Sequence, residues 1–154
     1  MGIIEKSDID NQIKQLRGRQ KKIVFTNGCF DLLHKGHVDL LNKASTFGDI
    51  LIVGLNSDNS VKTLKGQGRP IENEIIRSKK LLEIGNVDFV IIFNSETPKD
   101  LIIKIMPDVL VKGGDYNKDD IVGSNEVISS GGKVKIVPLT KGLSTTSIIK
   151  SRQG

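Results

Sequence analysis

"KKIVFTNGCFDLLHKGH", residues 21–37, joins a short apolar run to a loop that holds both histidines and the only cysteine of this chain. The run over residues 21–26 predicts a buried β-strand, and the apolar positions after the loop repeat at helical spacing. A strand followed by a glycine-containing loop and a helix is the unit from which parallel α/β sheets are built. The stretch therefore predicts an α/β fold whose ligand site lies beyond the end of this strand.

The rest of the chain continues this alternation of short apolar runs and amphipathic segments. Further strands are predicted over residues 50–55, 87–93, 108–112 and 133–139. Helices are predicted from about residue 36 and over residues 7–17, 72–84, 97–105 and 144–151. Because each strand is a nearly continuous apolar run, the five strands should form a parallel sheet with helices on both faces. No repeat or linker interrupts residues 1–154, which predicts a single domain with a helical extension over residues 1–20.

The composition narrows the class of ligand. The 154 residues carry a net charge of +5, yet only 4% of them are aromatic and the basic residues are scattered. Nucleic-acid-binding proteins usually combine a basic stripe with aromatic stacking platforms, so we expect no nucleic-acid partner. A basic nucleic-acid-binding domain stays open as an alternative, because a modest positive excess suits either a nucleic acid or a polyphosphate ligand.

The sequence pattern carries no membrane or export signal. Its apolar runs are far shorter than the roughly 20 residues that a membrane-spanning helix needs. The opening residues, "MGIIEKSDID", lack the basic start and apolar core of a signal peptide. A single cysteine, Cys29, cannot form an internal disulfide, which favours a reducing compartment. We therefore expect a cytoplasmic protein without a membrane partner.

The two histidines, His34 and His37, are three residues apart at the start of a predicted helix. Both can reach a ligand above the strand end, where imidazole N–H groups and the free amides of the helix would donate to phosphate oxygens. Gly28 and Gly36 let the backbone approach that ligand closely. Two surface histidines beside a helix cap are the alternative. A zinc pair is disfavoured, because the glutamate of H-E-x-x-H and a further Cys/His partner are missing, so we expect no protein metal site.

Polar clusters follow three other predicted strands, at residues 56–58, 112–116 and 140–146, and a basic loop spans residues 62–70. Because the carboxyl ends of parallel strands meet at one edge of the sheet, these clusters should converge on one site. Asp58 and Asp115 would accept hydrogen bonds from sugar hydroxyls, and Lys65 would bind phosphate. Ordinary turns and helix caps are the alternative for each cluster. The glycines form neither the dinucleotide fingerprint nor a P-loop, which disfavours a dehydrogenase or a P-loop kinase.

The motif "GCFDLLHKGH", residues 28–37, resembles the G-x-F-D-x-x-H-x-G-H signature of the nucleotidylyltransferase superfamily, in its cytidylyltransferase-like branch. The late motif "GLSTT", residues 142–146, is similar to the G-x-S-T-T element of the same branch. Within this branch, "LIVGLNSD", "LKGQGRPI", "LVKGGDY" and "STTSIIK" resemble the heptose 1-phosphate adenylyltransferases, over about residues 21–151. The resemblance implies a Rossmann-like domain, a homodimer, and Mg²⁺ bound mainly through the phosphates of ATP.

The activity that this resemblance implies is transfer of AMP from ATP to D-glycero-D-manno-heptose 1-phosphate. The products would be ADP-heptose, a lipopolysaccharide precursor, and pyrophosphate. No kinase half accompanies the motifs, so other enzymes would make the sugar 1-phosphate. Glycerol-3-phosphate cytidylyltransferases usually carry an arginine at the position of Leu139, and its loss favours ATP over CTP. A CTP-dependent glycerol-3-phosphate cytidylyltransferase and a non-catalytic nucleotide-binding module are the alternatives.

The motifs and the resemblance together assign roles to individual residues. Catalysis is expected of His34, His37 and Lys65, with the histidines on the triphosphate and Lys65 on the α-phosphate or the incoming phosphate. The nucleotide is expected to contact Thr26, Asn27, Gly28, Cys29, Phe30, Gly36, Arg77, Lys112, Gly114, Asp115, Gly142, Ser144, Thr145 and Thr146, with Ser144 and Thr145 at its β/γ end. The second substrate is expected to contact Asp31, Asn56, Asp58 and Lys62.

Overall fold

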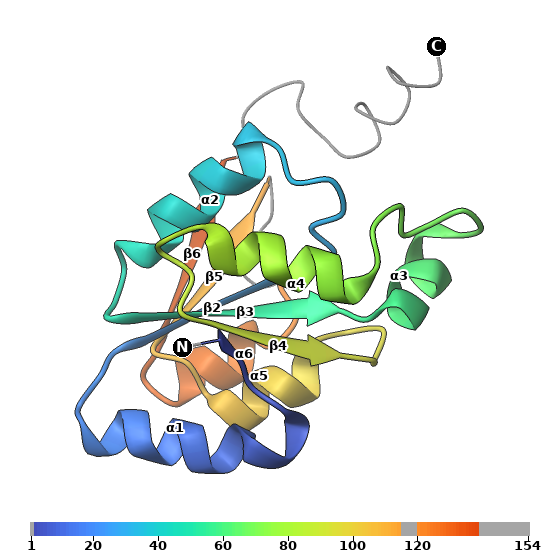
Figure 1. Ribbon diagram of the computed structural model, residues 1–154. Coiled ribbons are helices and arrows are strands. Elements are labelled where there is room, and N and C mark those ends of the chain that lie inside the picture. The colour runs from blue at the N-terminus through green and yellow to red at the C-terminus, as the bar shows by residue number, and fades with distance from the viewer. Residues whose placement is uncertain (1, 115–119, 139–154) are drawn as a thin grey trace.

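A single sheet organises the chain in a computed structural model that describes residues 2–114 and 120–138 (Figure 1). In these residues the sheet has six strands, all pairs are parallel, and the spatial order is β1-β4-β3-β2-β5-β6. The strands are β1 (Gly2–Ile3), β2 (Ile23–Gly28), β3 (Ile50–Asn56), β4 (Phe89–Phe93), β5 (Val109–Gly113) and β6 (Lys133–Val137). The predicted parallel α/β fold is confirmed. The strand number differs by one, because β1 is too short to carry a pattern.

Helices cover both faces of this sheet, as predicted. The helices are η1 (Lys6–Asp8), α1 (Ile9–Gly18), α2 (Lys35–Ser45), α3 (Asp58–Lys65), α4 (Glu74–Glu83), α5 (Lys99–Ile105) and α6 (Ser124–Ser129). In Figure 1, α2 and α4 lie on one side of the sheet and α1, α5 and α6 on the other. No helix in the described ranges has the length and apolar character needed to cross a membrane. The helix predicted over residues 144–151 lies outside the described residues.

Two apolar clusters hold the helices against the sheet. Side chains alternate between the faces of a strand, so Ile23 and Phe25 of β2 belong to the cluster under α1 and α5. Val24, between them, belongs to the cluster under α2 and α4. Burial on both faces explains why the strands are nearly continuous apolar runs.

The chain reverses its direction across the sheet at β2. From β2 it passes to β3 and β4 on one side, and it then returns to β5 and β6 on the other. Loops that leave β2 and β5 therefore diverge, and they leave a crevice at the carboxyl ends of these two strands, where ligands of open α/β sheets bind. The histidine-containing loop predicted from the sequence follows β2 and lies at this crevice.

An ion pair lies at the opposite edge of the sheet, at the amino ends of the central strands. Asp108, just before β5, accepts a hydrogen bond of 2.7 Å from the backbone N–H of Ile23 at the start of β2. The same carboxylate pairs with the guanidinium of Arg17 at 2.5 Å. Arg17 also donates to the carbonyl oxygen of Met106. One carboxylate thus joins α1 to the amino ends of two central strands.

Candidate functional site

A cavity of about 490 Å³ opens at the carboxyl ends of β2 and β5. The cavity gathers side chains from loops that are far apart in the sequence. Among the predicted site residues it is lined by Asn27, Gly28, Cys29, Phe30, His37, Asn56, Lys65 and Lys112. Residues that the sequence did not single out as ligand contacts also line it, namely Leu64, Arg69, Glu96, Thr97, Pro98 and Val122.

The loop between β2 and α2 has an unusual backbone. Phe30 and Leu32 have φ angles of 47° and 58°, in the left-handed region that residues other than glycine rarely adopt. The ring of Phe30 folds back over Gly28, where a Cβ atom would lie only 2.9 Å from Phe30 Cε2. A side chain at position 28 would therefore force this ring to shift.

The two histidines form a stacked pair at the start of α2. Their ring centroids are 3.8 Å apart, with an angle of 21° between the planes. His34 caps the helix, and its Nδ1 accepts from the backbone N–H of Gly36 at 3.1 Å. His37 Nδ1 accepts from the backbone N–H of His34 at 3.3 Å. Because both Nδ1 atoms accept, each neutral ring carries its hydrogen on Nε2.

Electrostatics keeps these rings neutral. Burial, together with the neighbouring His34 and Lys65, lowers the pKa of His37 to about 4. Burial also lowers the pKa of His34. Near neutral pH both rings therefore act as N–H donors without a positive charge. The Nε2 atom of His34 is buried and has no hydrogen-bond partner among the described residues.

Cationic side chains surround the cavity. Lys65 ends α3, Lys112 lies in β5, and Arg69 lies in the loop after α3. Glu96 is the single acidic residue in the part of the cavity lining that the structure describes. Burial raises the pKa of the Cys29 thiol, and the charges of Lys65, Arg77 and Arg69 only partly oppose this shift, so Cys29 is a poor nucleophile. This excess of positive charge in the lining suits an anionic ligand.

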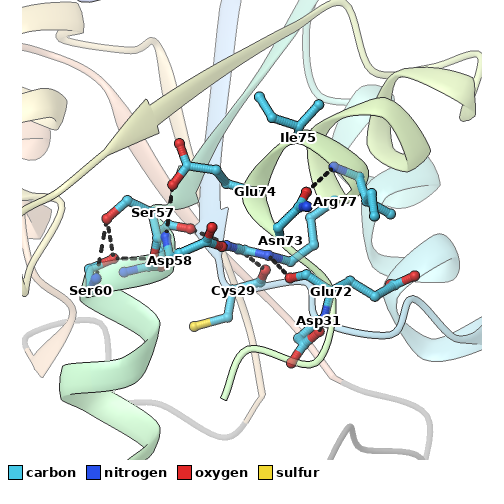
Figure 2. A network of polar contacts seen from close by, with 12 residues as sticks. Cys29, Asp31, Ser57, Asp58, Ser60, Glu72, Asn73, Glu74, Ile75 and Arg77 are labelled. Carbon is cyan, nitrogen blue, oxygen red and sulfur yellow. Dashed lines mark hydrogen bonds and ion pairs between the residues drawn. The ribbon is translucent and has the colours of Figure 1, made fainter. Parts of the chain in front are cut away.

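Arg77 lies outside this cavity, although the sequence assigned it to the nucleotide. Its side chain is 0% exposed, and its guanidinium donates to the carbonyl oxygens of Glu72, Cys29 and Asn56 at 2.9, 2.8 and 2.7 Å. It also pairs with Asp58 at 2.8 Å (Figure 2). These contacts join the loops that follow β2 and β3. Arg77 therefore supports the residues around the cavity without lining it. The carboxylate of Asp58, which was expected to contact the second substrate, pairs with Arg77.

Asp31 is equally enclosed. Only 1% of its side chain is exposed, and it accepts hydrogen bonds from the backbone N–H groups of Ile71 and Glu72 at 2.7 and 2.9 Å. Its Oδ2 also lies 3.1 Å from Nε of Arg69. The contact with the second substrate that the sequence predicted for Asp31 is absent from the described cavity lining, and Asp31 fastens the loop over residues 69–72.

The remaining predicted residues are dispersed around the cavity. Thr26 is fully buried in β2, Gly36 is buried in the first turn of α2, and Lys62 is exposed on α3 away from the lining. Gly114 follows β5 with a φ of 114°, and its N–H donates to Val137 at the end of β6. Five further predicted residues, together with Leu139, lie outside the described residues: Asp115, Gly142, Ser144, Thr145 and Thr146.

Sequence reasoning missed Arg69 and the segment over residues 96–98. A signal for both existed. Arg69 belongs to the basic loop over residues 62–70, and residues 96–98 follow the carboxyl end of β4. The helix predicted over residues 97–105 begins at Lys99, and Thr97 and Pro98 before it line the cavity.

The described residues contain no group of three or more His, Cys, Asp or Glu side chains that could hold a metal ion. The lining instead offers imidazole, ammonium and guanidinium groups.

Comparisons with known proteins agree with this geometry. Residues 25–151 match the family model described as cytidylyltransferase-like. The chain is 47% identical over 153 residues to the bifunctional protein HldE of Vibrio cholerae serotype O1 (strain M66-2), which is 99% of this chain and 32% of that protein. It is 49% identical over 152 residues to the HldE of Histophilus somni (strain 129Pt), with the same coverage. The chain thus spans about a third of the length of the curated relatives it matches.

A solved structure shares the fold. The crystal structure of the lipopolysaccharide core biosynthesis protein from Thermoplasma volcanium GSS1 has a TM-score of 0.65 and 27% sequence identity to this chain. The match covers 79% of this chain and 98% of that one.

Proposed function

This chain belongs to the cytidylyltransferase-like family, and from that premise we propose that it transfers AMP from ATP to D-glycero-D-manno-heptose 1-phosphate, giving ADP-heptose and pyrophosphate. The observation that carries the proposal is the cavity itself, where Lys65, Lys112 and a neutral His37 meet above the end of β2. The motif resemblance to heptose 1-phosphate adenylyltransferases supports the choice of substrates. The likeness to a lipopolysaccharide core biosynthesis protein supports a sugar-nucleotide product.

The reaction needs positioning more than proton transfer. An oxygen of the sugar phosphate, already an anion, attacks the α-phosphorus of ATP. A new phosphorus–oxygen bond forms, the bond from the α-phosphorus to the oxygen bridging to the β-phosphate breaks, and pyrophosphate leaves with that electron pair. Repulsion between the anions and the charge growing on the leaving group set the barrier. Preorganised donors that face these charges therefore supply most of the acceleration.

The cavity residues have complementary parts in this proposal. His37, stacked on His34, presents an Nε2–H donor to the triphosphate, while His34 caps the first turn of α2. Lys65 neutralises the α-phosphate or the incoming phosphate, and Lys112 faces it from β5. The backbone of Cys29 and Phe30 borders the nucleotide. Asn56, at the end of β3, is left to contact the second substrate.

Magnesium, when bound, would neutralise the triphosphate and the departing pyrophosphate. We propose that it arrives with ATP, held mainly by the phosphate oxygens and by water. Ser144 and Thr145 are proposed to bind the β/γ end from the late motif. We further propose one catalytic domain over the whole chain, a homodimer and a cytoplasmic location, and sedimentation of the purified protein would test the dimer.

A coupled pyrophosphate assay tests the proposed function. The purified chain is given ATP or CTP, each with heptose 1-phosphate or glycerol 3-phosphate. ATP with heptose 1-phosphate should be turned over, and kcat/KM should favour ATP over CTP by at least about tenfold, since Leu139 cannot donate to cytosine. A preference for CTP with glycerol 3-phosphate would replace this proposal with the cytidylyltransferase alternative. Nucleotide binding without pyrophosphate release from any pair would leave a non-catalytic module.

A further inference from the structure

Arg69 is the one arginine that lines the described part of the cavity, and the roles assigned from the sequence do not include it. Its side chain is 12% exposed, so it is held within the wall and does not extend into solvent. Its Nη2 atom is buried and has no hydrogen-bond partner among residues 2–114 and 120–138. A buried cationic N–H group without an acceptor is costly, so the site is built for an acceptor that the described chain does not supply.

The anchoring of Arg69 leaves its terminal nitrogens for that acceptor. Nε donates to Asp31 Oδ2 at 3.1 Å, and Asp31 is itself fixed by the backbone N–H groups of Ile71 and Glu72. This carboxylate therefore holds both the guanidinium and the loop that carries it. A guanidinium held at its Nε edge loses little further rotamer freedom when it binds a ligand.

A comparison with Arg77 shows why the two arginines differ in function. Arg77 donates to three backbone carbonyls and to Asp58, and no part of its side chain reaches solvent. Arg69 has one carboxylate partner and a place in the cavity wall with Lys65. Its charge also acts on Cys29 at the cavity floor, where it opposes the rise in the thiol pKa. The arginine that faces a ligand is thus the one in the loop, and the arginine on α4 is structural.

We propose that the guanidinium of Arg69 donates to a phosphate oxygen of a substrate in this cavity, and that Asp31 is the residue that positions it. The inference rests on the proposed function to the extent that the ligand carries phosphate. The same guanidinium could meet the triphosphate or the sugar phosphate, and these two sources are separated below by which substrate loses affinity. A planar fork of donors beside the point charge of Lys65 suits a phosphoryl group with two free oxygens.

The test measures binding first, without turnover. Inorganic pyrophosphate and ATP with Mg²⁺ are titrated into wild-type protein, Arg69→Gln and Arg69→Lys by calorimetry, and heptose 1-phosphate is titrated separately. Arg19→Gln is the matched control, because Arg19 is exposed at the end of α1 and the substitution removes the same charge. Thermal unfolding of each variant checks that it is folded.

We expect Arg69→Gln to weaken binding of pyrophosphate and ATP, or of heptose 1-phosphate, by about 10- to 100-fold, the usual effect of losing a charge-assisted hydrogen bond. Loss for pyrophosphate and ATP locates Arg69 at the triphosphate, and loss for the sugar phosphate alone locates it at the acceptor. Arg69→Lys should fall between Gln and wild type, because lysine keeps the charge and loses the fork. If Arg69→Gln does not fold, Arg69→Lys carries the test with an expected loss of about fivefold or more.

Two results would overturn the proposal: unchanged affinities for all three ligands in a folded Arg69 variant, or no binding of any of them by wild-type protein. Failure of the proposed function looks different. If the wild type releases no pyrophosphate from ATP and heptose 1-phosphate, but Arg69→Gln still weakens pyrophosphate or ATP binding, the phosphate contact stands and the reaction does not.

Discussion

Nη1 of Arg77 donates a hydrogen bond of 2.8 Å to the carbonyl oxygen of Cys29, 48 residues earlier in the chain. The same nitrogen donates to the carbonyl of Asn56, so one buried guanidinium joins the loops after β2 and β3. This contact therefore helps to hold the loop between β2 and α2 in place. Removing the guanidinium would take this buried donor away from the carbonyl oxygens of Cys29 and Asn56.

Arg77→Met should therefore destabilise the protein severely. Deleting one member of a buried network leaves its partners desolvated and unpaired, which typically costs about 3–5 kcal/mol. Urea unfolding followed by circular dichroism would measure the free energy of unfolding. Lys79→Met, an exposed position on the same helix, is the control and should change it by less than about 0.5 kcal/mol. Equal stability of the two variants would show that the Arg77 contacts contribute little.

His37→Ala should lower kcat by about 100-fold, because loss of one preorganised donor commonly has that effect. The melting temperature should change by only a few degrees, since the hydrogen bond of the ring to the backbone N–H of His34 is long, at 3.3 Å, and its stacking partner is another partly exposed side chain. Steady-state kinetics of pyrophosphate release would measure kcat. Lys35→Ala, in the same turn of α2 and exposed, should keep kcat within about twofold, as its pair with Asp39 is a surface ion pair. An unchanged kcat in folded His37→Ala would remove His37 from the catalytic assignment.

Acid should destabilise wild-type protein more than His37→Gln. The folded-state pKa of His37 is about 4 and the unfolded value is near 6.5, so the unfolded state binds the proton more readily between these values. Stability is therefore lost as the pH falls from about 6.5 towards 4. Because part of the ring still contacts water, we expect the wild type to lose about 1 kcal/mol more than His37→Gln between pH 7.5 and 5.0. Urea titrations at both pH values would show this, and parallel losses would contradict the low pKa.

Cys29→Ser should retain most of the activity. Burial raises the pKa of the thiol, so little thiolate exists near neutral pH, and the contact of Cys29 with Arg77 is made by its backbone. The kcat/KM of the variant should stay within about threefold of wild type, and iodoacetamide should modify the wild-type thiol more slowly than free cysteine. Near-total loss of activity in Cys29→Ser would restore a chemical role to the sulfur.

The fold could be predicted from the sequence because the strands are buried on both faces. Runs such as residues 50–55 carry that burial in their composition, and β3 begins at the predicted residue. The two-residue β1 and the six-residue α6 are too short for any periodicity to reveal. Helix α3 occupies residues between the predicted polar cluster at 56–58 and the predicted basic loop, where Ser57 caps it and Arg77 pairs with Asp58 in its first turn.

The site could be predicted only as a neighbourhood. Parallel strands end at one edge, so the meeting of Asn27, Asn56 and Lys112 follows from the pattern of the sequence. Which arginine lines the cavity does not follow from that pattern, because Arg77 is bound by backbone carbonyls that no residue type encodes. The hydrogens of His34 and His37 are likewise set by backbone N–H groups in the folded loop, and the sequence left charged and neutral rings equally open.

The contacts of Asp108 with Arg17 and Ile23 have a consequence for how this protein could be engineered. Arg17, Asp108 and Ile23 meet at the amino edge of the sheet, while the cavity opens at the carboxyl edge, a full strand length away. Heat tolerance can therefore be selected in a library confined to the first edge without disturbing turnover. Substitutions around the cavity that change substrate preference can then be tolerated, because the free energy of unfolding gained at the amino edge offsets the stability that they cost.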